Sequence, residues 1–283
     1  MSFPDQPEIH PPLGPATSVP EFAPGEAAAR KPRERSDWNP MTAPATYLLL
    51  AINILVFLWM IGHGVSPTSP GSRDLVRYGA SSTLLELNGQ WYRLLTAIFV
   101  HIGIIHLATN MWCLWNLGML GEPLIGPYGL VTVYLITGIA GNLLAMAWDV
   151  GYALFFHEQL TFGIGAGASG AVFGIAGLLI VLLSNRKLPI PWGELKRLRR
   201  SVVQFAVLNL VIGASTILPV FGSFVRIDNS AHIGGFLSGL ALGPGLVPRM
   251  TAGRSGYLAR QKIVFGAATF LLILFGYWIA KLV

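Results

Sequence analysis

A glycine-rich stretch from Gly165 to Gly174 carries the residue types that nucleophilic chemistry requires. Ser169 lies within it, where Gly-Ala-Ser-Gly (167–170) leads into an apolar run free of charge. Small neighbours leave a serine hydroxyl accessible, and open backbone N–H groups beside it could stabilise an oxyanion. The alternative interpretation is a small-residue face for helix packing, which is common in membrane proteins.

A second segment supplies a candidate base. His232 lies two residues into another apolar run, and neutral histidine can take the proton of a serine hydroxyl. No Asp or Glu lies at a matching depth, so we predict a Ser169–His232 dyad rather than a triad. Asp228, four residues before His232, is the weaker alternative of an orienting carboxylate.

A third segment supplies hydrogen-bond donors. His106 and Asn110 are four residues apart, on one face of a helix, and with the Ser169 N–H they could hold an oxyanion. They could instead bridge helices as polar packing residues. A metal site of His101, His106 and His232 is a further alternative, which the i, i+5 spacing of the first two and the lack of a carboxylate disfavour.

Composition places these residues in a membrane. The 283 residues are 53% hydrophobic and 11% charged, which indicates a polytopic membrane protein. The net charge of +6 comes from short basic clusters between apolar runs, so we expect no nucleic-acid partner. The single cysteine, Cys113, excludes an intramolecular disulfide and a cysteine-based zinc site. No cleavable signal peptide is recognised, and the first span is the expected insertion signal.

Apolar runs and basic clusters define the expected topology. Residues 1–44 hold ten of the 19 prolines and predict a disordered cytoplasmic tail. Seven runs are long enough, or nearly so, to span the bilayer: 45–63, 102–120, 127–148, 168–184, 201–221, 230–248 and 263–281. Of the 19 Lys and Arg residues, 14 lie in the tail and in the connectors after the fourth and sixth runs. The positive-inside rule makes that side cytoplasmic, with the N-terminus inside and the C-terminus outside.

This topology brings the polar residues to one depth. Ser169, His232 and the His101 to Asn110 segment all fall near the outer ends of their spans. Glycine stripes in the fourth and sixth spans predict a close approach that places His232 within reach of Ser169. The connector 64–101 mixes charged and aromatic residues, and we expect it to rest in or on the outer interface.

Together these motifs resemble the rhomboid family of intramembrane serine proteases, over roughly residues 45–250. Gly-Ala-Ser-Gly (167–170) is similar to the family's Gly-x-Ser-Gly, and Ala231-His232 with Gly235 and Gly239 to its Ala-His-x-x-Gly-x-x-x-Gly. His101, His106 and Asn110 reproduce its His-x-x-x-x-His-x-x-x-Asn. Tyr92-Arg93, after Trp91, is similar to its aromatic-Arg pair in the first outer loop.

The resemblance implies an all-α, six-helix rhomboid bundle over 45–250, followed by a cytoplasmic linker and a seventh membrane helix over 251–283. It implies Ser169 as nucleophile, His232 as base, and an oxyanion hole of His106, Asn110 and the Ser169 N–H. The supporting residues it implies are Gly167, Phe173, His101, Arg93 and Glu122. Phe173 stands where bacterial relatives often have Tyr, and its ring could still stack on His232. Tyr92 stands where Trp is usual.

The expected function is an intramembrane serine endopeptidase that cleaves membrane-protein substrates within the bilayer, with no cofactor or metal. The alternatives are a non-catalytic rhomboid-like protein that binds membrane clients, and a small-solute transporter or channel, for which the spans show no inverted repeat. The expected location is a bacterial inner membrane, with an organelle membrane as the alternative. The sequence does not reveal the oligomeric state or the substrate.

Overall fold

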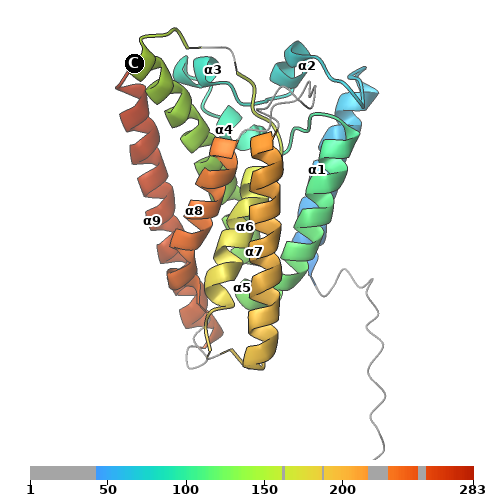
Figure 1. Cartoon of the computed structure of the whole chain (residues 1–283), viewed down its shortest axis with the longest axis vertical. Helices are drawn as coiled ribbons and strands as arrows, with labels where there is room; N and C mark the ends of the chain where they lie inside the picture. Colours follow the sequence, from blue (N-terminus) through green and yellow to red (C-terminus); the bar gives the residue numbers. More distant parts are fainter. Residues whose placement is uncertain (1–42, 161–162, 187, 216–228, 248–252) are drawn as a thin grey trace, which may run out of the picture. The chain divides into compact units, whose positions relative to one another are not determined.

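The computed structural model describes residues 43–160, 163–186, 188–215, 229–247 and 253–283. The predicted tail, up to residue 42, and Asp228 lie outside these ranges. The secondary structure of the described residues is helical, apart from one isolated bridge (Figure 1). The helices are α1 (Pro44–Gly62), α2 (Ser72–Arg77), α3 (Thr83–Leu87), α4 (Arg93–Thr96), α5 (Ile104–Phe156), α6 (Ser169–Leu182), α7 (Trp192–Ser215), α8 (Asn229–Leu246) and α9 (Arg254–Ala280).

The element α5 contains two of the predicted spans. It is 53 residues long, but Gly126 interrupts it with φ 76° and ψ 166°, which are not helical values. Pro123 and Pro127 flank this point, and proline removes a helical hydrogen bond. The interruption falls between the predicted runs 102–120 and 127–148, so α5 consists of two arms.

Length and surface both indicate a membrane environment. Within the described ranges, α1, α5 and α9 are long and apolar enough to cross a bilayer, and α6 is a shorter apolar helix. Large apolar side chains on the long helices are exposed, among them Leu55, Phe155 and Ile263. Such surfaces are unfavourable in water and stable against lipid. The chain is therefore an all-helical, multi-pass membrane protein.

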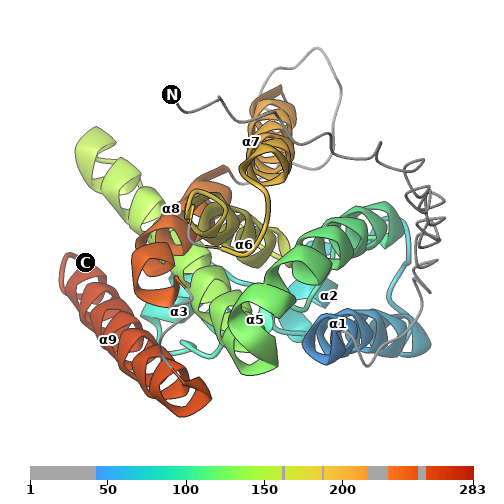
Figure 2. The ribbon, with the colours of Figure 1, turned by 90° about the horizontal axis from the view of Figure 1, so that it is seen from below.

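The core of the bundle is α6, which packs against α5, α7 and α8 (Figure 2). Its contact with α8 is unusually close. A Cβ added at Gly235 would collide with the Gly170 carbonyl oxygen, and one at Gly239 with that of Gly174. Only glycine permits backbones to approach in this way. The predicted approach of the two glycine-bearing spans is confirmed.

Glu122 fixes the start of α1 against α5. Its buried carboxylate accepts hydrogen bonds from the backbone N–H groups of Ala45 and Thr46, at 2.9 and 2.8 Å, and from the Thr46 hydroxyl at 2.7 Å. The first N–H groups of a helix lack partners within the helix, and a negative charge there is favourable. The structural role expected for Glu122 is therefore a helix cap supplied from 77 residues away.

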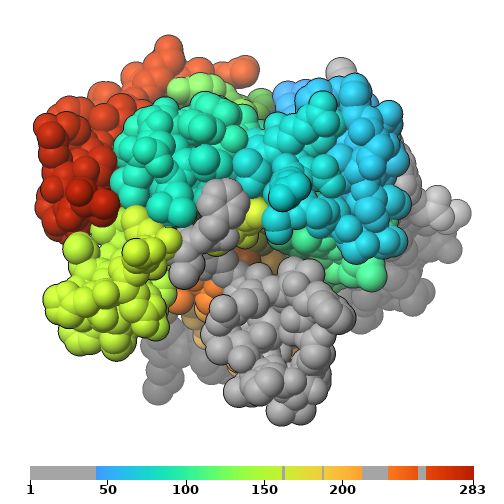
Figure 3. Space-filling model, turned by 90° about the horizontal axis from the view of Figure 1, so that it is seen from above, coloured from blue at the N-terminus to red at the C-terminus, as the bar shows by residue number. Residues whose placement is uncertain are grey.

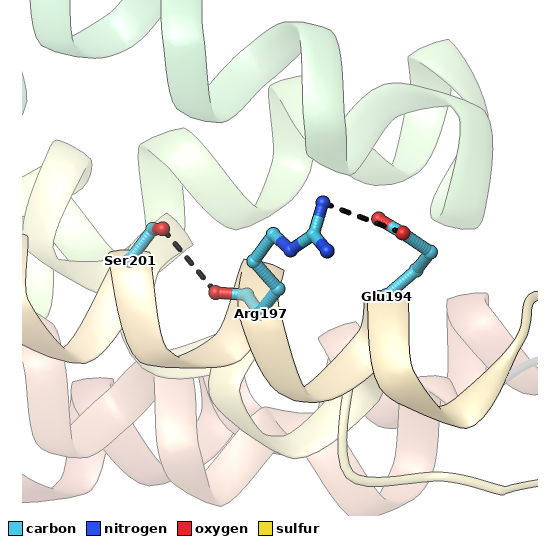
Figure 4. A network of polar contacts seen from close by, with 3 residues as sticks. All are labelled: Glu194, Arg197 and Ser201. Carbon is cyan, nitrogen blue, oxygen red and sulfur yellow. Dashed lines mark hydrogen bonds and ion pairs between the residues drawn. The ribbon is translucent and has the colours of Figure 1, made fainter.

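The two ends of the bundle differ in character. The short helices α2 and α3 lie at the end where the chain terminates, and we call this the α2–α4 end (Figure 1). At the opposite end, the first turns of α7 are basic. There Arg197 pairs with Glu194 at 3.4 Å, and its carbonyl accepts a hydrogen bond from Ser201 (Figure 4). Both charged side chains of this pair are exposed, so it contributes little to stability.

Candidate active site

Ser169 is the first residue of α6, and it is partly exposed while the helix behind it is buried. Residues 163–168 approach it without helical structure. The N–H groups of the first turn of a helix point outward without partners in the helix, and the macrodipole adds positive potential there. The position suits a nucleophile that needs an anion-stabilising surface beside it.

Gly167 shapes the approach to the serine. Its φ is +133°, a conformation that residues with a side chain rarely adopt. A Cβ at this position would lie 2.6 Å from Cε1 and 3.0 Å from Nε2 of His106. Its N–H donates to the Ala97 carbonyl at 2.9 Å. The His106 ring therefore rests directly on the backbone that leads into Ser169.

His232 reaches the same region from α8. Its buried ring stacks on that of Phe173, with centroids 4.5 Å apart and planes 13° from parallel. Phe173 lies one turn after Ser169 on the same face of α6. The close crossing of α6 and α8 at Gly170 and Gly235 lies beside these residues, because Gly170 directly follows Ser169 and Gly235 comes three residues after His232. The predicted stacking of Phe173 on His232 is confirmed, and His232 faces the side of α6 that carries Ser169.

His106 and Asn110 present donors from the first arm of α5. The Ile102 N–H donates to His106 Nδ1 at 3.3 Å, which leaves the proton of the neutral ring on Nε2, the nitrogen beside Gly167. The Asn110 amide donates one hydrogen bond to the His106 carbonyl at 3.0 Å and retains a second N–H. Among the residues that the structure describes, neither remaining donor has an acceptor, so each side chain has an N–H group for a substrate oxygen.

His101 is fully buried, and both of its ring nitrogens are engaged. Nδ1 lies 3.2 Å from the Phe99 carbonyl, and Nε2 accepts the Ala168 N–H at 3.4 Å. The ring therefore carries its proton on Nδ1 and orients the residue directly before Ser169. This geometry supports the structural role expected for His101 and argues against its use as a metal ligand.

Arg93 holds together the segment between α2 and α4 by hydrogen bonds. Its guanidinium donates to the carbonyls of Val76 and Ala80, at 2.7 and 2.9 Å, and to Gln90 Oε1 at 2.7 Å. It also lies over the exposed Tyr92 ring, 5.3 Å from its centroid. A planar fork of donors suits several carbonyls at once. Arg93 thus holds the backbone of 76–80 in place and lies outside the group that surrounds Ser169.

Two buried residues at this end, Ser81 and Glu86, were not predicted from the sequence. Ser81 forms an antiparallel bridge with Gly165, and its hydroxyl donates to Glu86 Oε1 at 2.6 Å. Glu86 is completely buried, although the sequence of the connector 64–101 predicts a segment that rests in or on the membrane interface. Only its apolar neighbours Leu84, Leu85 and Leu87 signal burial, and they do not identify its partner.

Comparison with known proteins places these features in one family. The model of the Rhomboid domain matches residues 88–249. The chain is 36% identical over 195 residues to rhomboid protease GluP of Bacillus subtilis, covering 69% of this chain and 33% of that protein. It is 30% identical over 200 residues to rhomboid protease AarA of Providencia stuartii, and this match covers 69% of each protein. It is 33% identical over 177 residues to RHOMBOID-like protein 7 of Arabidopsis thaliana, and this match covers 58% of this chain and 49% of the Arabidopsis protein. The match thus spans only a third of the Bacillus protein's length. The family model covers more than half of the chain, and the chain therefore belongs to the rhomboid family.

Proposed function

We propose that this chain is an intramembrane serine endopeptidase with Ser169 as nucleophile and His232 as general base. Its substrates are membrane proteins with a transmembrane segment that unwinds near its outer end. The observation that carries the proposal is the stack of His232 on Phe173, one helical turn from Ser169. Two relatives named as proteases, GluP and AarA, support the same activity.

The chemistry follows from the positions of these side chains. Ser169 Oγ attacks the scissile carbonyl carbon while its proton passes to the His232 ring. The carbonyl oxygen becomes an oxyanion, held by the Ser169 N–H, His106 Nε2–H and the remaining Asn110 N–H. The C–N bond then breaks, and His232 returns the proton to the leaving amine. Water repeats the sequence on the acyl-enzyme, with His232 again as base, and releases the carboxylic acid.

The environment of Ser169 suits this two-step reaction. Ser169 is partly exposed at the α2–α4 end, whereas His232 and Phe173 are buried beneath it. Water can reach the serine from this end while the base stays shielded by packed helices. We assign this end to the outer side of the membrane, because the basic turns of α7 lie at the opposite end. The bacterial inner membrane is the proposed location.

A serine-directed fluorophosphonate tests the nucleophile without knowledge of the substrate. We expect the purified protein in liposomes to form one covalent adduct, which peptide mass spectrometry places on Ser169. The Ser169→Ala variant should form none. His232→Ala should react far more slowly, because the hydroxyl then lacks its base.

The control is Ser184→Ala, which removes an exposed serine two residues beyond the end of α6, whose hydroxyl donates to the Ile180 carbonyl and accepts a hydrogen bond from Arg199. It should react like the parent protein. A well-folded parent that is not labelled would contradict the proposal and favour the non-catalytic, client-binding alternative. Equal labelling of the Ser169→Ala variant would show that another residue reacts.

A further inference from the structure

The backbone that leads into Ser169 is attached to the segment 72–101 by three backbone–backbone hydrogen bonds, in addition to the bond from the Ala168 N–H to His101 Nε2. Ser81 N–H donates to the Gly165 carbonyl at 2.8 Å, and Gly165 N–H donates back to Ser81 at 3.0 Å. Gly167 N–H donates to the Ala97 carbonyl at 2.9 Å. The position of Gly165 to Gly167, and with it the surface beside Ser169, therefore depends on where Ser81 and Ala97 lie.

Ser81 is itself held by a buried carboxyl group. Its hydroxyl donates to Glu86 Oε1 at 2.6 Å, and both side chains are buried. Within the described part of the chain, Glu86 Oε2 has no hydrogen-bond partner. A buried carboxylate with a bare oxygen is unfavourable, whereas a protonated carboxyl avoids burying the charge. The proposed catalytic chemistry makes no use of Glu86.

Two charged groups face Glu86, one from each neighbouring element. Arg93 of α4 directs its N–H donors to the carbonyls of Val76 and Ala80 and to Gln90. Asp149 of α5 accepts the Thr83 hydroxyl at 2.6 Å. Burial raises the pKa of Glu86 above its ordinary value, and the negative charge of Asp149 acts in the same direction. The Ser81 hydrogen bond, a backbone hydrogen bond from Ser82 and the Arg93 charge each lower the pKa of Glu86, without cancelling its rise.

We propose that Glu86 and Ser81 are positioning residues for catalysis, which fix the Gly165 backbone and thereby the surface beside Ser169. The proposal rests on the proposed protease function. The neutral carboxyl accepts the Ser81 hydroxyl and keeps the bridge in register. Deprotonation leaves the Ser81 hydroxyl its acceptor, but it places a second negative charge near Asp149 at a buried position, which destabilises the segment that carries the bridge. Because the folded-state pKa is the raised one, the stabilisation is complete at low pH and is lost as the pH rises through that value.

The position of the segment fits this role. Viewed from above, residues coloured cyan to teal, which include 72–101, spread over the α2–α4 end beside the red C-terminal helix α9 (Figure 3). A change in the Ser81 bridge therefore acts at the face from which water and substrate reach Ser169. The segment is held by interactions of Thr83 and Glu86 in α3 and of Arg93 in α4.

The test compares kcat and KM of the variants Glu86→Gln, Glu86→Ala and Ser81→Ala from about pH 5 to pH 9, with a single-span substrate in liposomes. Glu86→Gln keeps an acceptor for Ser81 but cannot ionise. We expect it to retain the low-pH kcat of the parent within about twofold and to remove the decline at high pH. Glu86→Ala and Ser81→Ala should each lower kcat roughly five- to tenfold with little change in KM, since each removes one buried hydrogen bond.

The control variant is Glu158→Gln, at an exposed glutamate of the same end, which should match the parent at every pH. A parent-like kcat in Glu86→Ala, or an unchanged pH profile in Glu86→Gln, would overturn the positioning role. If Glu86→Ala does not fold, Glu86→Gln and Ser81→Ala decide the question alone. An inactive parent would refute the protease function as well, so the two failures are distinguishable.

Discussion

Replacing Gly167 by alanine perturbs the candidate oxyanion surface by a single methyl group. The new Cβ would lie 2.6 Å from His106 Cε1, whereas carbon atoms in contact are about 3.5–4.0 Å apart, so the ring must move by about 1 Å. A shift of that size in a catalytic group typically lowers the rate by about 100-fold. The φ of +133° adds backbone strain of about 1–3 kcal/mol. We therefore expect kcat to fall about 100-fold and KM to change little.

The assay is cleavage of a single-span substrate in liposomes, with thermal unfolding measured in parallel. The control is Gly163→Ala, four residues earlier, where an added Cβ meets nothing within 4 Å and φ is not positive. His106→Ala removes the ring with which the new methyl collides, so adding Gly167→Ala to it should cost much less than in the parent. Full activity of Gly167→Ala, or equal losses in Gly167→Ala and Gly163→Ala, would refute the placement of His106 against this backbone.

Three further predictions concern residues around this region. Asn110→Ala should lower kcat about 100-fold yet leave more activity than Ser169→Ala, because two oxyanion donors remain; equal inactivity in folded protein would assign Asn110 another role. Glu122→Ala should lower the unfolding free energy by about 3 kcal/mol, since three donors lose their acceptor, while Ser169 still reacts with the phosphonate well below the melting temperature. Arg93→Lys should destabilise the protein by about 1–2 kcal/mol, since an ammonium group cannot reproduce the planar fork; an unchanged melting temperature would contradict that role.

The residues of the candidate site were predictable because membrane topology restricts where they can lie. Apolar run length and basic connectors placed Ser169, His232 and His106 at one depth before any contact was known. Glycine spacing then predicted the close helix crossing, which Gly235 and Gly239 make against α6. Depth and small-residue periodicity are both properties of local sequence, so they can be read from it.

Contacts between segments that are distant in the sequence could not be predicted from run length or residue spacing. Glu122 was expected to be structural only through the family resemblance, and its sequence neighbours give no sign that it caps α1. The bridge from Ser81 to Gly165 joins two loops without a repeating pattern. Glu86 resembled a solvated charge, and its burial depends on how α3 packs against the bundle. These features follow from tertiary packing, which residue spacing does not encode.

The most direct test of the protease function is a time course of cleavage of a single-span model substrate by the purified protein in liposomes. The parent, Ser169→Ala and His232→Ala proteins are compared side by side, with unfolding temperatures confirming that each is folded. We expect cleavage by the parent alone. Cleavage by the Ser169→Ala variant at the parent's rate would contradict this expectation, because the reaction would then proceed without the nucleophile on which the site is built.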